Sequence, residues 1–500
     1  MKTRICIPHI CLLSVVLFPF LTFFSQLSVR EAATLGVWTQ PINLSNSQSY
    51  STSPLVVSDL VGNVHVVWGE SSQENDSNSP DTVYYRRLID GTWSDSYDIL
   101  AVGNGDGAVP HALTVDRHNR LVLLWSQNNQ LNISLADVTD ARSAQAWITV
   151  SLESNASIHG ADLALDQSGK YYVAYVRNAE EIITLHADDT GENWSVPVVV
   201  ALNTQTDFAF GLVSTAVDAA GRIFVSWTRH AEETNWAPAG VWFSRSIDEG
   251  QSWPMVEEVA PGLGYGASEL FVDADDKLHL VWIGNLMAGG RYHRWSSDGG
   301  ENWSDSITIS LASGYAGPPT MLQDNGAKIH LICAGIGLGR QDSIWYSALD
   351  DRGWNSALVI SGDLPDSQGP SAAISLGHVI HAVWIEYDSA DIWYSSYDTG
   401  APATLVTAME GTVLVPTQTA DSVAELQPAD TPSISRTMSS PTTELAISSA
   451  LASGISGTSG AGDAQHMTIS GSTILIISVL PALVVVGGVV LIKLRRSRQR

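Results

Sequence analysis

Two arginines and one acid–phenol pair are the side chains of this sequence with the clearest chemical potential. Arg177 and Arg229 each lie two residues after the aromatic residue that ends a β-branched stretch, and Glu386 and Tyr387 follow another such stretch. Planar guanidinium groups pair bidentately with carboxylates, so the two arginines are candidates for holding a carboxylate ligand. No spacing in the sequence singles out a nucleophile or a metal site. We therefore expect ligand contacts, with no metal and no cofactor.

These residues recur at matching places in a repeat of about fifty residues. Each copy has a tight turn, usually opened by Asp, and then a β-branched or aromatic strand; the copies begin at Asp59, Asp116, Asp166, Asp218, Asp273, Asp324 and Ser375. A fixed period of this size is typical of a propeller or a solenoid. Each unit divides into four strands, which fits a propeller blade.

The two ends of the repeat predict that it closes on itself. Residues 37–45 have the pattern of a fourth strand without a preceding first three, and the last unit stops after its third strand near Gly400. The N-terminal strand can complete the last blade and remove exposed edges, whereas an open solenoid would carry atypical capping repeats. We predict an all-β fold, a seven-bladed β-propeller over residues 36–402 that is closed by its N-terminal strand.

The remaining segments predict export and membrane attachment. Residues 1–33 have a basic start and an apolar run, typical of a secretory signal peptide, with an uncleaved anchor as the alternative. Residues 403–472, rich in Ser, Thr, Pro, Ala and Gly, predict a disordered stalk. Residues 474–492 carry no charge and are long enough for a transmembrane helix, and basic residues 493–500 predict a cytoplasmic tail. The chain is thus predicted to be a single-pass protein of the cell membrane with its propeller outside.

The charge of the chain limits the classes of partner that it can bind, and its cysteine content limits how the fold is stabilised. The chain has 25 Lys and Arg against 52 Asp and Glu, for a net charge of -27. Every acidic residue lies between Glu31 and Ser470, whereas several basic residues lie outside this segment. The exported part is therefore more acidic than the whole chain and would repel a phosphate backbone. We expect a membrane and an extracellular glycan or protein as partners, and no nucleic acid. Cys333 is the single cysteine outside the predicted signal peptide, so the core must hold without disulfides.

Three units carry a Ser/Ala-x-Asp-x-Gly-x-x-Trp pattern between their third and fourth strands, at residues 187–194, 246–253 and 296–303. The pattern resembles the Asp-box (BNR) repeat of sialidase-like β-propellers. In that family the boxes are structural and lie away from the ligand, so the resemblance implies no chemistry for them. We expect the carboxylates to accept turn amide protons, the glycines to adopt positive φ and the tryptophans to pack over the hairpin. The residues concerned are Asp189, Gly191, Trp194, Asp248, Gly250, Trp253, Asp298, Gly300 and Trp303.

The resemblance also implies what a catalytic site would require. A sialidase uses three arginines for the substrate carboxylate, a Tyr nucleophile activated by Glu, and an Asp acid. The early Arg-Ile-Pro motif of that family is absent from this sequence, and Glu386–Tyr387 resembles the family's Glu/Tyr pair only distantly. The leading hypothesis is a non-catalytic receptor that binds a glycan or protein at its central face. The alternatives are a cell-surface glycoside hydrolase of the exo-sialidase type with a diverged site, and an adhesive role without a small ligand.

In such propellers the working face carries the loops from fourth to first strand and from second to third. Aromatic rings with a few polar groups there would suit sugar stacking or peptide capture, unless the loops are merely solvated or fill the channel. The ligand candidates from the first set of loops are Tyr50, His111, His159, Phe210, Tyr265 and Tyr315. The second set adds Glu70, Gln127, His230 and Asn285 to the four residues named at the outset. The repeated His65, His279, His330 and His381 are predicted to be packed in the core.

Overall fold

The computed structural model describes residues 36–71, 80–102, 107–262, 264–284, 290–309, 317–336 and 341–405, which belong to one compact unit. The predicted signal peptide, membrane span and tail lie outside these ranges, as do the stalk beyond Leu405 and the ligand candidates Tyr315 and Asn285. Within the described ranges, no helix has the length and apolarity needed to cross a bilayer.

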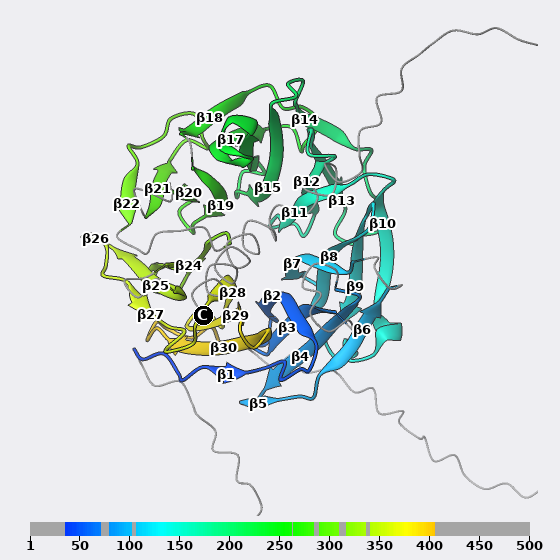
Figure 1. Ribbon diagram of the computed structural model, residues 1–500, viewed down its shortest axis with the longest axis vertical. Coiled ribbons are helices and arrows are strands. Elements are labelled where there is room, and N and C mark those ends of the chain that lie inside the picture. The colour runs from blue at the N-terminus through cyan, green and yellow to red at the C-terminus, as the bar shows by residue number, and fades with distance from the viewer. Residues whose placement is uncertain are drawn as a thin grey trace, which may run out of the picture. The chain divides into compact units, whose positions relative to one another are not determined.

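Seven antiparallel sheets stand around a common centre (Figure 1), which confirms the predicted all-β, seven-bladed propeller. From the centre outward, the first strands are β2 (Tyr50–Ser58), β7 (Val109–Val115), β11 (Ile158–Leu165), β15 (Phe208–Val217), β19 (Gly266–Val272), β23 (Thr320–Gln323) and β28 (Ser367–Ser375). The second strands are β3 (Val64–Ser71), β8 (Arg120–Gln127), β12 (Tyr171–Arg177), β16 (Ile223–Ala231), β20 (Leu278–Ile283), β24 (Ile329–Ile336) and β29 (Val379–Glu386).

The outer half of each blade holds the third and fourth strands. The third strands are β4 (Thr82–Ile89), β9 (Gln130–Asp137), β13 (Glu181–Ala187), β17 (Ala237–Ser246), β21 (Arg291–Ser296), β25 (Asp342–Asp350) and β30 (Asp391–Asp398). The fourth are β5 (Thr92–Trp93) with β6 (Tyr97–Ala101), β10 (Ile148–Ser154), β14 (Val198–Leu202), β18 (Val256–Pro261), β22 (Ile307–Ile309), β26 (Gly353–Trp354) with β27 (Leu358–Val359), and β1 (Ile42–Asn43).

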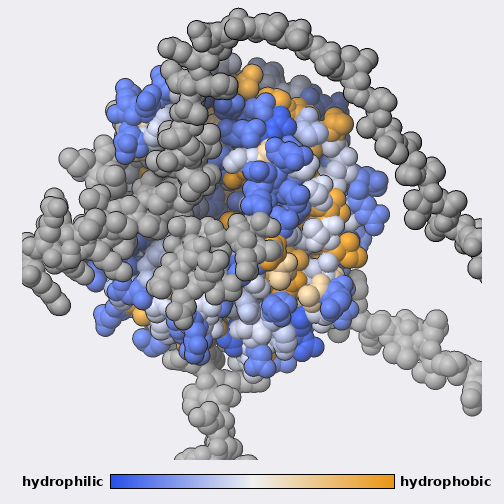
Figure 2. Space-filling view, turned by 45° about the vertical axis from the view of Figure 1, so that its right-hand side comes forward, coloured by the Kyte–Doolittle hydropathy of each residue, from blue (hydrophilic) through white to orange (hydrophobic). Residues whose placement is uncertain are grey.

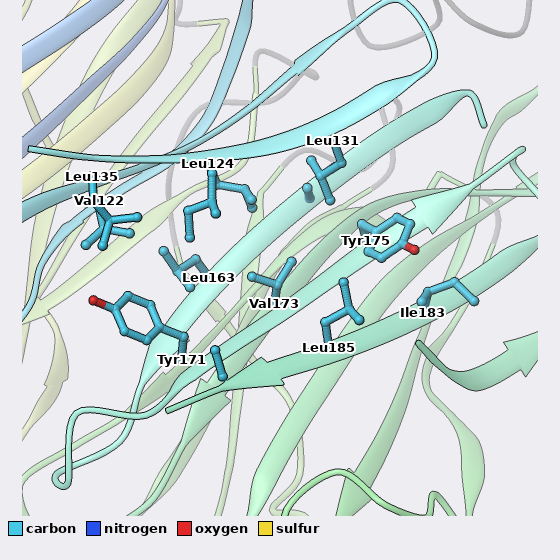
Figure 3. Close-up of a cluster of buried hydrophobic side chains, with 13 residues drawn as sticks. Val122, Leu124, Leu131, Leu135, Leu163, Tyr171, Val173, Tyr175, Ile183 and Leu185 are labelled. Atoms are coloured by element: carbon cyan, nitrogen blue, oxygen red, sulfur yellow. The ribbon is translucent and has the colours of Figure 1, made fainter. Parts of the chain in front are cut away.

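The core consists of side chains packed between neighbouring blades. The second strands are buried along almost their whole length, as in β3 and β20, because a blade covers each of their two faces. This explains why they appear in the sequence as continuous apolar runs. Figure 3 shows one such interface, where Val122 and Leu124 of β8 face Leu163 of β11 and Val173 of β12. On the part of the face that Figure 2 leaves uncovered, apolar residues are scattered among mostly hydrophilic ones. Single exposed apolar residues of this kind are ordinary in folded proteins.

The N-terminal strand closes the ring, as predicted. β1 pairs with β30 in the last blade, and the two lie side by side in Figure 1. The Leu44 amide donates to the Ile392 carbonyl at 2.7 Å. The Asp391 carboxylate accepts hydrogen bonds from Asn43 Nδ2 and Ser45 Oγ, both at 2.7 Å, and from the Ser47 amide at 3.0 Å. Three hydrogen bonds to one carboxylate thus fix the closing segment.

The strand directions give the ring two different faces. The loop face carries the connections from second to third strand and from fourth to first; the turn face carries the turns from first to second and from third to fourth. Both ends of the described chain lie on the turn face. The Gly36 amide donates to the Asp398 carbonyl at 2.9 Å. Asn325 Nδ2, in a first-to-second turn, donates to Pro402 O at 2.8 Å and to Thr404 Oγ1 at 2.9 Å.

Two of the three Asp-containing turns have the predicted hydrogen bonds. The Asp248 carboxylate accepts the Ser252 amide at 2.9 Å and Ser246 Oγ at 2.7 Å, and Asp298 accepts the Asn302 amide and Ser296 Oγ in the same way. Hydrogen bonds from Ser252 lower the pKa of Asp248 to about 2. The predicted positive φ is present in all three glycines, at 72° for Gly191, 83° for Gly250 and 82° for Gly300.

The first turn differs from the prediction, because Asp188 and not Asp189 accepts its hydrogen bonds. Asp188 accepts the Thr190 amide at 3.1 Å and Asn193 Nδ2 at 2.5 Å. The other two turns begin with a Ser whose hydroxyl holds the Asp, but this one begins with Ala187 and has no such hydroxyl. Asp189 turns instead toward the preceding blade and binds Arg117 and His118.

The tryptophans of these turns pack over their hairpins as expected. Trp194 donates from Nε1 to the Gly191 carbonyl at 3.0 Å and lies 6.2 Å from the Tyr171 ring. Trp303 meets the Phe243 ring edge to face at 5.3 Å, across the blade boundary. Trp253 packs against the buried cluster around Trp227. These turns therefore join neighbouring blades as well as closing their own hairpins.

Candidate functional site

The loop face collects most of the candidate residues because strands of alternating direction end or begin there. Tyr50 opens β2, Arg177 ends β12, and Glu386 ends β29. Arg229 lies two residues before the end of β16. The strands thus bring the candidates to one face, and their individual contacts decide what each can do.

Arg177 is engaged by acids of the protein itself. Its guanidinium pairs with Glu153 at 3.1 Å and with Glu181 at 2.6 Å. The hydrogen bond with Glu181 raises the pKa of Arg177, so its charge is permanent. Tyr175 adds a hydrogen bond to the same Glu153 oxygen at 2.9 Å. Two carboxylates already neutralise the charge that a ligand carboxylate would need.

Arg229 is held by aromatic rings and not by acids. Its guanidinium carbon lies 3.2 Å from the centre of the Phe208 ring and 5.6 Å from that of Trp242. Nη2 donates to Gln205 Oε1 at 3.4 Å. Among the described residues, no ion pair joins Arg229 to an acid and no contact joins it to Arg177. The predicted pair of arginines is therefore not an assembled carboxylate clamp.

Glu386 and Tyr387 are not arranged as a base and a nucleophile. The Glu386 carboxylate accepts the amide protons of Asp388 at 2.8 Å and Ser389 at 2.9 Å, so it caps the turn between β29 and β30. Burial raises the pKa of Tyr387 to about 12, with a contribution from the charge of Asp342. A phenol nucleophile needs a lowered pKa or an adjacent free base. Tyr387 instead stays protonated and acts as a hydrogen-bonding aromatic residue.

Tyr50 and Tyr387 do come together across the closure of the ring. Their ring centres lie 6.2 Å apart with a tilt of 56°. Burial, together with the nearby Tyr387 and Glu386, raises the pKa of Tyr50. This aromatic pair is formed by the first and last blades of the sequence, so it exists only because the ring closes.

The other candidates are largely occupied within their own blades. His111 Nε2 lies 2.8 Å from Ser126 Oγ, and burial lowers the pKa of His111 to about 4, which keeps it neutral. His159 Nε2 lies 3.0 Å from Ser157 Oγ. Tyr265 packs against the rings of Trp282 and Tyr292.

The remaining predicted residues, which come from both sets of loops, also serve the fold. His230 Nδ1 lies 2.9 Å from the Trp236 carbonyl, and Gln127 Nε2 donates to Gln130 Oε1 at 3.3 Å. Glu70 accepts Trp68 Nε1 at 3.0 Å and the Ser47 hydroxyl. Phe210 meets Trp227 edge to face at 5.9 Å. For these residues the interpretation that the loops complete the protein's own packing is the better one.

The structure builds a polar cluster from three blades that no individual signal in the sequence predicted. Arg291 opens β21, is fully buried, and donates to the carbonyls of Gly290 and Ala334. Asp342 opens β25 next to it, and Gln368 of β28 donates from Nε2 to Asp342 Oδ2 at 2.6 Å. Burial, followed by the charge of Asp366, raises the pKa of Asp342 to about 6, although Arg291 opposes this.

A repeated polar residue at the start of the third strand was the available clue. Third strands open with Gln130, Glu181, Arg291, Asp342 and Asp391 in five blades. That position falls on the loop face in every blade. The sequence could not show which of these residues find partners from neighbouring blades.

The repeated histidines are buried, as predicted, and have partners that the sequence analysis did not identify. His65, His330 and His381 pair through Nδ1 with the hydroxyls of Tyr85, Tyr346 and Tyr394 at 2.7, 2.9 and 2.8 Å. In the fifth blade His293 replaces the Tyr and lies 2.9 Å from His279. These pairs satisfy buried polar groups inside each sheet and are not ligand sites.

The innermost strands are joined by a second repeated contact. In four blades, the side chain four residues before the Asp or Ser that opens the turn accepts a backbone amide from the first strand of the next blade. The pairs are Asp162 with Thr215 at 2.7 Å, Ser214 with Leu270 at 3.0 Å, Glu269 with Met321 at 3.0 Å and Ser371 with Val56 at 3.2 Å. Side chains thus satisfy the amides at the open edge of each blade.

Comparisons with known proteins give likenesses of fold only. No family model and no curated protein matches the sequence. Solved structures similar to the chain include a protein of unknown function from Dyadobacter fermentans, at 12% identity over 72% of this chain and 98% of that one, with a TM-score of 0.47. The Hadza microbial sialidase Hz136 is 13% identical over 70% and 66%, with a TM-score of 0.42. The intramolecular trans-sialidase of Ruminococcus gnavus is 14% identical over 72% and 96%, with a TM-score of 0.41. Likenesses at this level assign neither a family nor an activity to this chain.

Proposed function

We propose that this chain is a recognition protein, a seven-bladed propeller anchored in the cell membrane that binds a glycan or protein ligand at its loop face without catalysis. One observation carries the proposal. The groups that would perform hydrolysis at this face are already engaged by the protein, Glu386 by turn amides and Arg177 by two acids, while Tyr387 has a raised pKa. The Tyr50–Tyr387 pair and the cluster around Asp342 are left as contact groups.

The positions of the chain ends support presentation of this face. Residues 401–405 run along the turn face, where Thr404 also donates its amide to the Leu376 carbonyl at 2.8 Å. The described chain therefore ends on the face opposite the loop face, and this leaves the loop face free of the segment that leads into the predicted stalk.

The test combines binding and turnover on the full purified chain. We expect the protein to bind members of a glycan array or a peptide array, and the Tyr50→Ala variant to bind them at least tenfold more weakly. The control is Asp350→Asn, which changes an acidic residue on the turn face. A fluorogenic sialoside is expected to stay intact with the wild-type chain.

Turnover of that sialoside would overturn the proposal if it disappears in Tyr387→Phe or Arg177→Ala. Array binding that Tyr50→Ala and Asp350→Asn weaken equally would also contradict it, since the loop face would then have no special role. Melting temperatures of the variants separate loss of binding from loss of folding.

A further inference from the structure

Among the residues that the structure describes, none donates a hydrogen bond to two buried oxygen atoms at the loop face. Gln368 is 5% exposed, and its Oε1 has no partner although its Nε2 donates to Asp342 at 2.6 Å. Asp342 Oδ1 is likewise without a partner. The amide orientation is fixed, because the opposite flip would set Gln368 Oε1 against the carboxylate. Buried acceptors are normally paired, so these two atoms mark a place where a donor from outside the chain would be stabilised.

The charges around these atoms favour a positively charged donor. Asp366 lies close enough to Asp342 for its charge to act on that carboxyl group. Arg291 also lies near and its charge opposes that of one carboxylate, so the two carboxylates and the one guanidinium leave a net negative charge; the guanidinium donates to the carbonyls of Gly290 and Ala334. The whole chain has a net charge of -27, so its long-range field attracts cations.

An aromatic pair lies in the neighbourhood of Asp342. Tyr387 is near enough to Asp342 to feel its charge, and the Tyr387 amide donates to the Asp366 carbonyl at 3.2 Å. The Tyr50 ring lies 6.2 Å from that of Tyr387. A carboxylate combined with aromatic faces is the usual environment for an organic cation.

A metal ion fits the same atoms less well. Among the described residues, no three His, Cys, Asp or Glu side chains are grouped so as to hold a metal. Calcium takes about six to eight oxygen ligands. Two acceptors match instead the N–H donors of a guanidinium or a primary ammonium group.

We propose that Asp342 and Gln368, next to the Tyr50–Tyr387 pair, form a subsite for the cationic side chain of a basic peptide, a lysine ammonium or an arginine guanidinium. This inference rests on the proposed function, because it requires the loop face to be the ligand face. A peptide is preferred to an amino sugar because a strongly acidic protein gains most from a ligand that can carry several positive charges.

The probes are fluorescein-labelled peptides of glycine with one lysine or one arginine, and the same lysine peptide with its ammonium acetylated. Polarisation is measured with the full chain in detergent at 150 mM NaCl. We expect both cationic peptides to bind and the acetylated peptide to bind at least tenfold more weakly. Asp342→Asn keeps the size of the side chain and is expected to weaken binding at least tenfold. Asp350→Asn, at the opposite end of the same strand β25, removes the same charge and is expected to change binding less than twofold.

Equal weakening by Asp342→Asn and Asp350→Asn would overturn the proposal, since binding would then follow net charge alone. So would binding of labelled glucosamine in place of the peptides. Gln368→Glu serves as a second variant that keeps the side chain's size, and thermal melting confirms that each variant is folded. If Tyr50→Ala weakens the binding of array ligands and Asp342→Asn leaves it unchanged, the proposed function stands and only the cation subsite is wrong. If nothing binds the loop face, both fail.

Discussion

Two carboxylates on the innermost strands are held where their charge is disfavoured. Asp162 accepts amide protons from Thr215 at 2.7 Å and Leu163 at 2.8 Å, which lower its pKa, but burial outweighs them and raises the pKa to about 6. Burial, with the charge of Asp162 adding to it, also raises the pKa of Glu269. The backbone amides that donate hydrogen bonds to these two side chains require an oxygen acceptor, but this acceptor need not carry a negative charge.

Asp162→Asn is therefore expected to stabilise the propeller at neutral pH. The pKa is about 6 in the folded protein, against about 3.9 for an unfolded aspartate, so the stability given by Asp162 is complete below pH 4 and is lost as the pH rises through 6. At about 1.4 kcal/mol per unit, two pKa units correspond to about 2.7 kcal/mol, which sets the upper limit of the effect. Asn has one oxygen acceptor where Asp162 uses two, so the variant loses one of the two amide hydrogen bonds at every pH. We expect a net gain of about 1–2 kcal/mol at pH 7.5 and a loss of about 1 kcal/mol at pH 4, measured by urea unfolding at both values.

Ser371→Ala is the companion measurement, because it removes the equivalent acceptor of the Val56 amide in another blade, away from Asp162 and without a titrating group. Its effect is expected to be the same at both pH values. A pH-independent effect of Asp162→Asn would show that charge at this position does not matter.

At the residue scale, the sequence predicted local features and missed those built from several blades. The positive φ of Gly191, Gly250 and Gly300 follows from turn geometry within eight residues, so a short pattern is enough to identify it. The predicted role of Asp189 was wrong because Arg117 of the preceding blade binds its carboxylate. The Asp342–Gln368 contact joins residues 26 positions apart on different blades, and no periodicity encodes it.

At the element scale, the Asp-containing turns offer two glycines with the same backbone conformation and different surroundings. Gly250 and Gly300 have φ of 83° and 82°. A Cβ on Gly250 would lie 3.5 Å from Ile223 Cδ1, which is an ordinary contact. A Cβ on Gly300 would lie 2.6 Å from Cζ of Phe243, which is too close. The Phe243 ring is fully buried and packs edge to face against Trp303, so it has little room to move.

Gly250→Ala is expected to cost about 1 kcal/mol of unfolding free energy, because an L-residue is strained at this φ. Gly300→Ala carries the same strain, and displacing Phe243 adds about 1–3 kcal/mol. Denaturant unfolding of the two variants measures the difference directly. Equal losses would mean that the Phe243 ring moves aside at no cost, and that the turn does not couple its blade to the next.

The strands themselves were predicted better at the centre of each blade than at its rim. First, second and third strands fall where the repeat places them, since burial enforces their pattern. The fourth strand of the fifth blade does not follow the Asp-containing turn directly but begins at Ile307, because the turn continues through the hydrogen bond from the Ser304 amide to the Trp295 carbonyl. In the first and sixth blades the fourth strand is split in two. Outer strands contact solvent on one side, so their sequences are less constrained.

At the scale of the whole molecule, closure gives the protein both its stability and its candidate site. The segment that completes the last blade continues from Ser45 into Tyr50, so the strand that locks the ring also delivers one ring of the Tyr50–Tyr387 pair. Seven copies of the repeat, and an N-terminal fourth strand without a first three before it, were enough to predict that the ring closes. The sequence could not predict which residues would meet at the seam, because the two sides lie more than 300 positions apart.

Asp391 is the residue on which this seam most depends, since Asn43, Ser45 and Ser47 all donate to its carboxylate. Asp391→Ala leaves these donors without their acceptor and is expected to lower the unfolding free energy by about 3 kcal/mol, with hydrogen bonds to a charged group taken as about 1.5–3 kcal/mol each and water replacing part of the loss. The closing segment should then detach first, so protease cleavage within residues 36–49 should become faster while cleavage elsewhere changes little.

Asp398→Ala is the matched control, because Asp398 lies at the other end of β30 and its carboxylate caps only the Gly400 amide. Since the released segment also positions Tyr50, Asp391→Ala should weaken array binding in proportion to the opened fraction. A ring that stays protected from protease in Asp391→Ala would show that backbone pairing between β1 and β30 closes the propeller without the carboxylate.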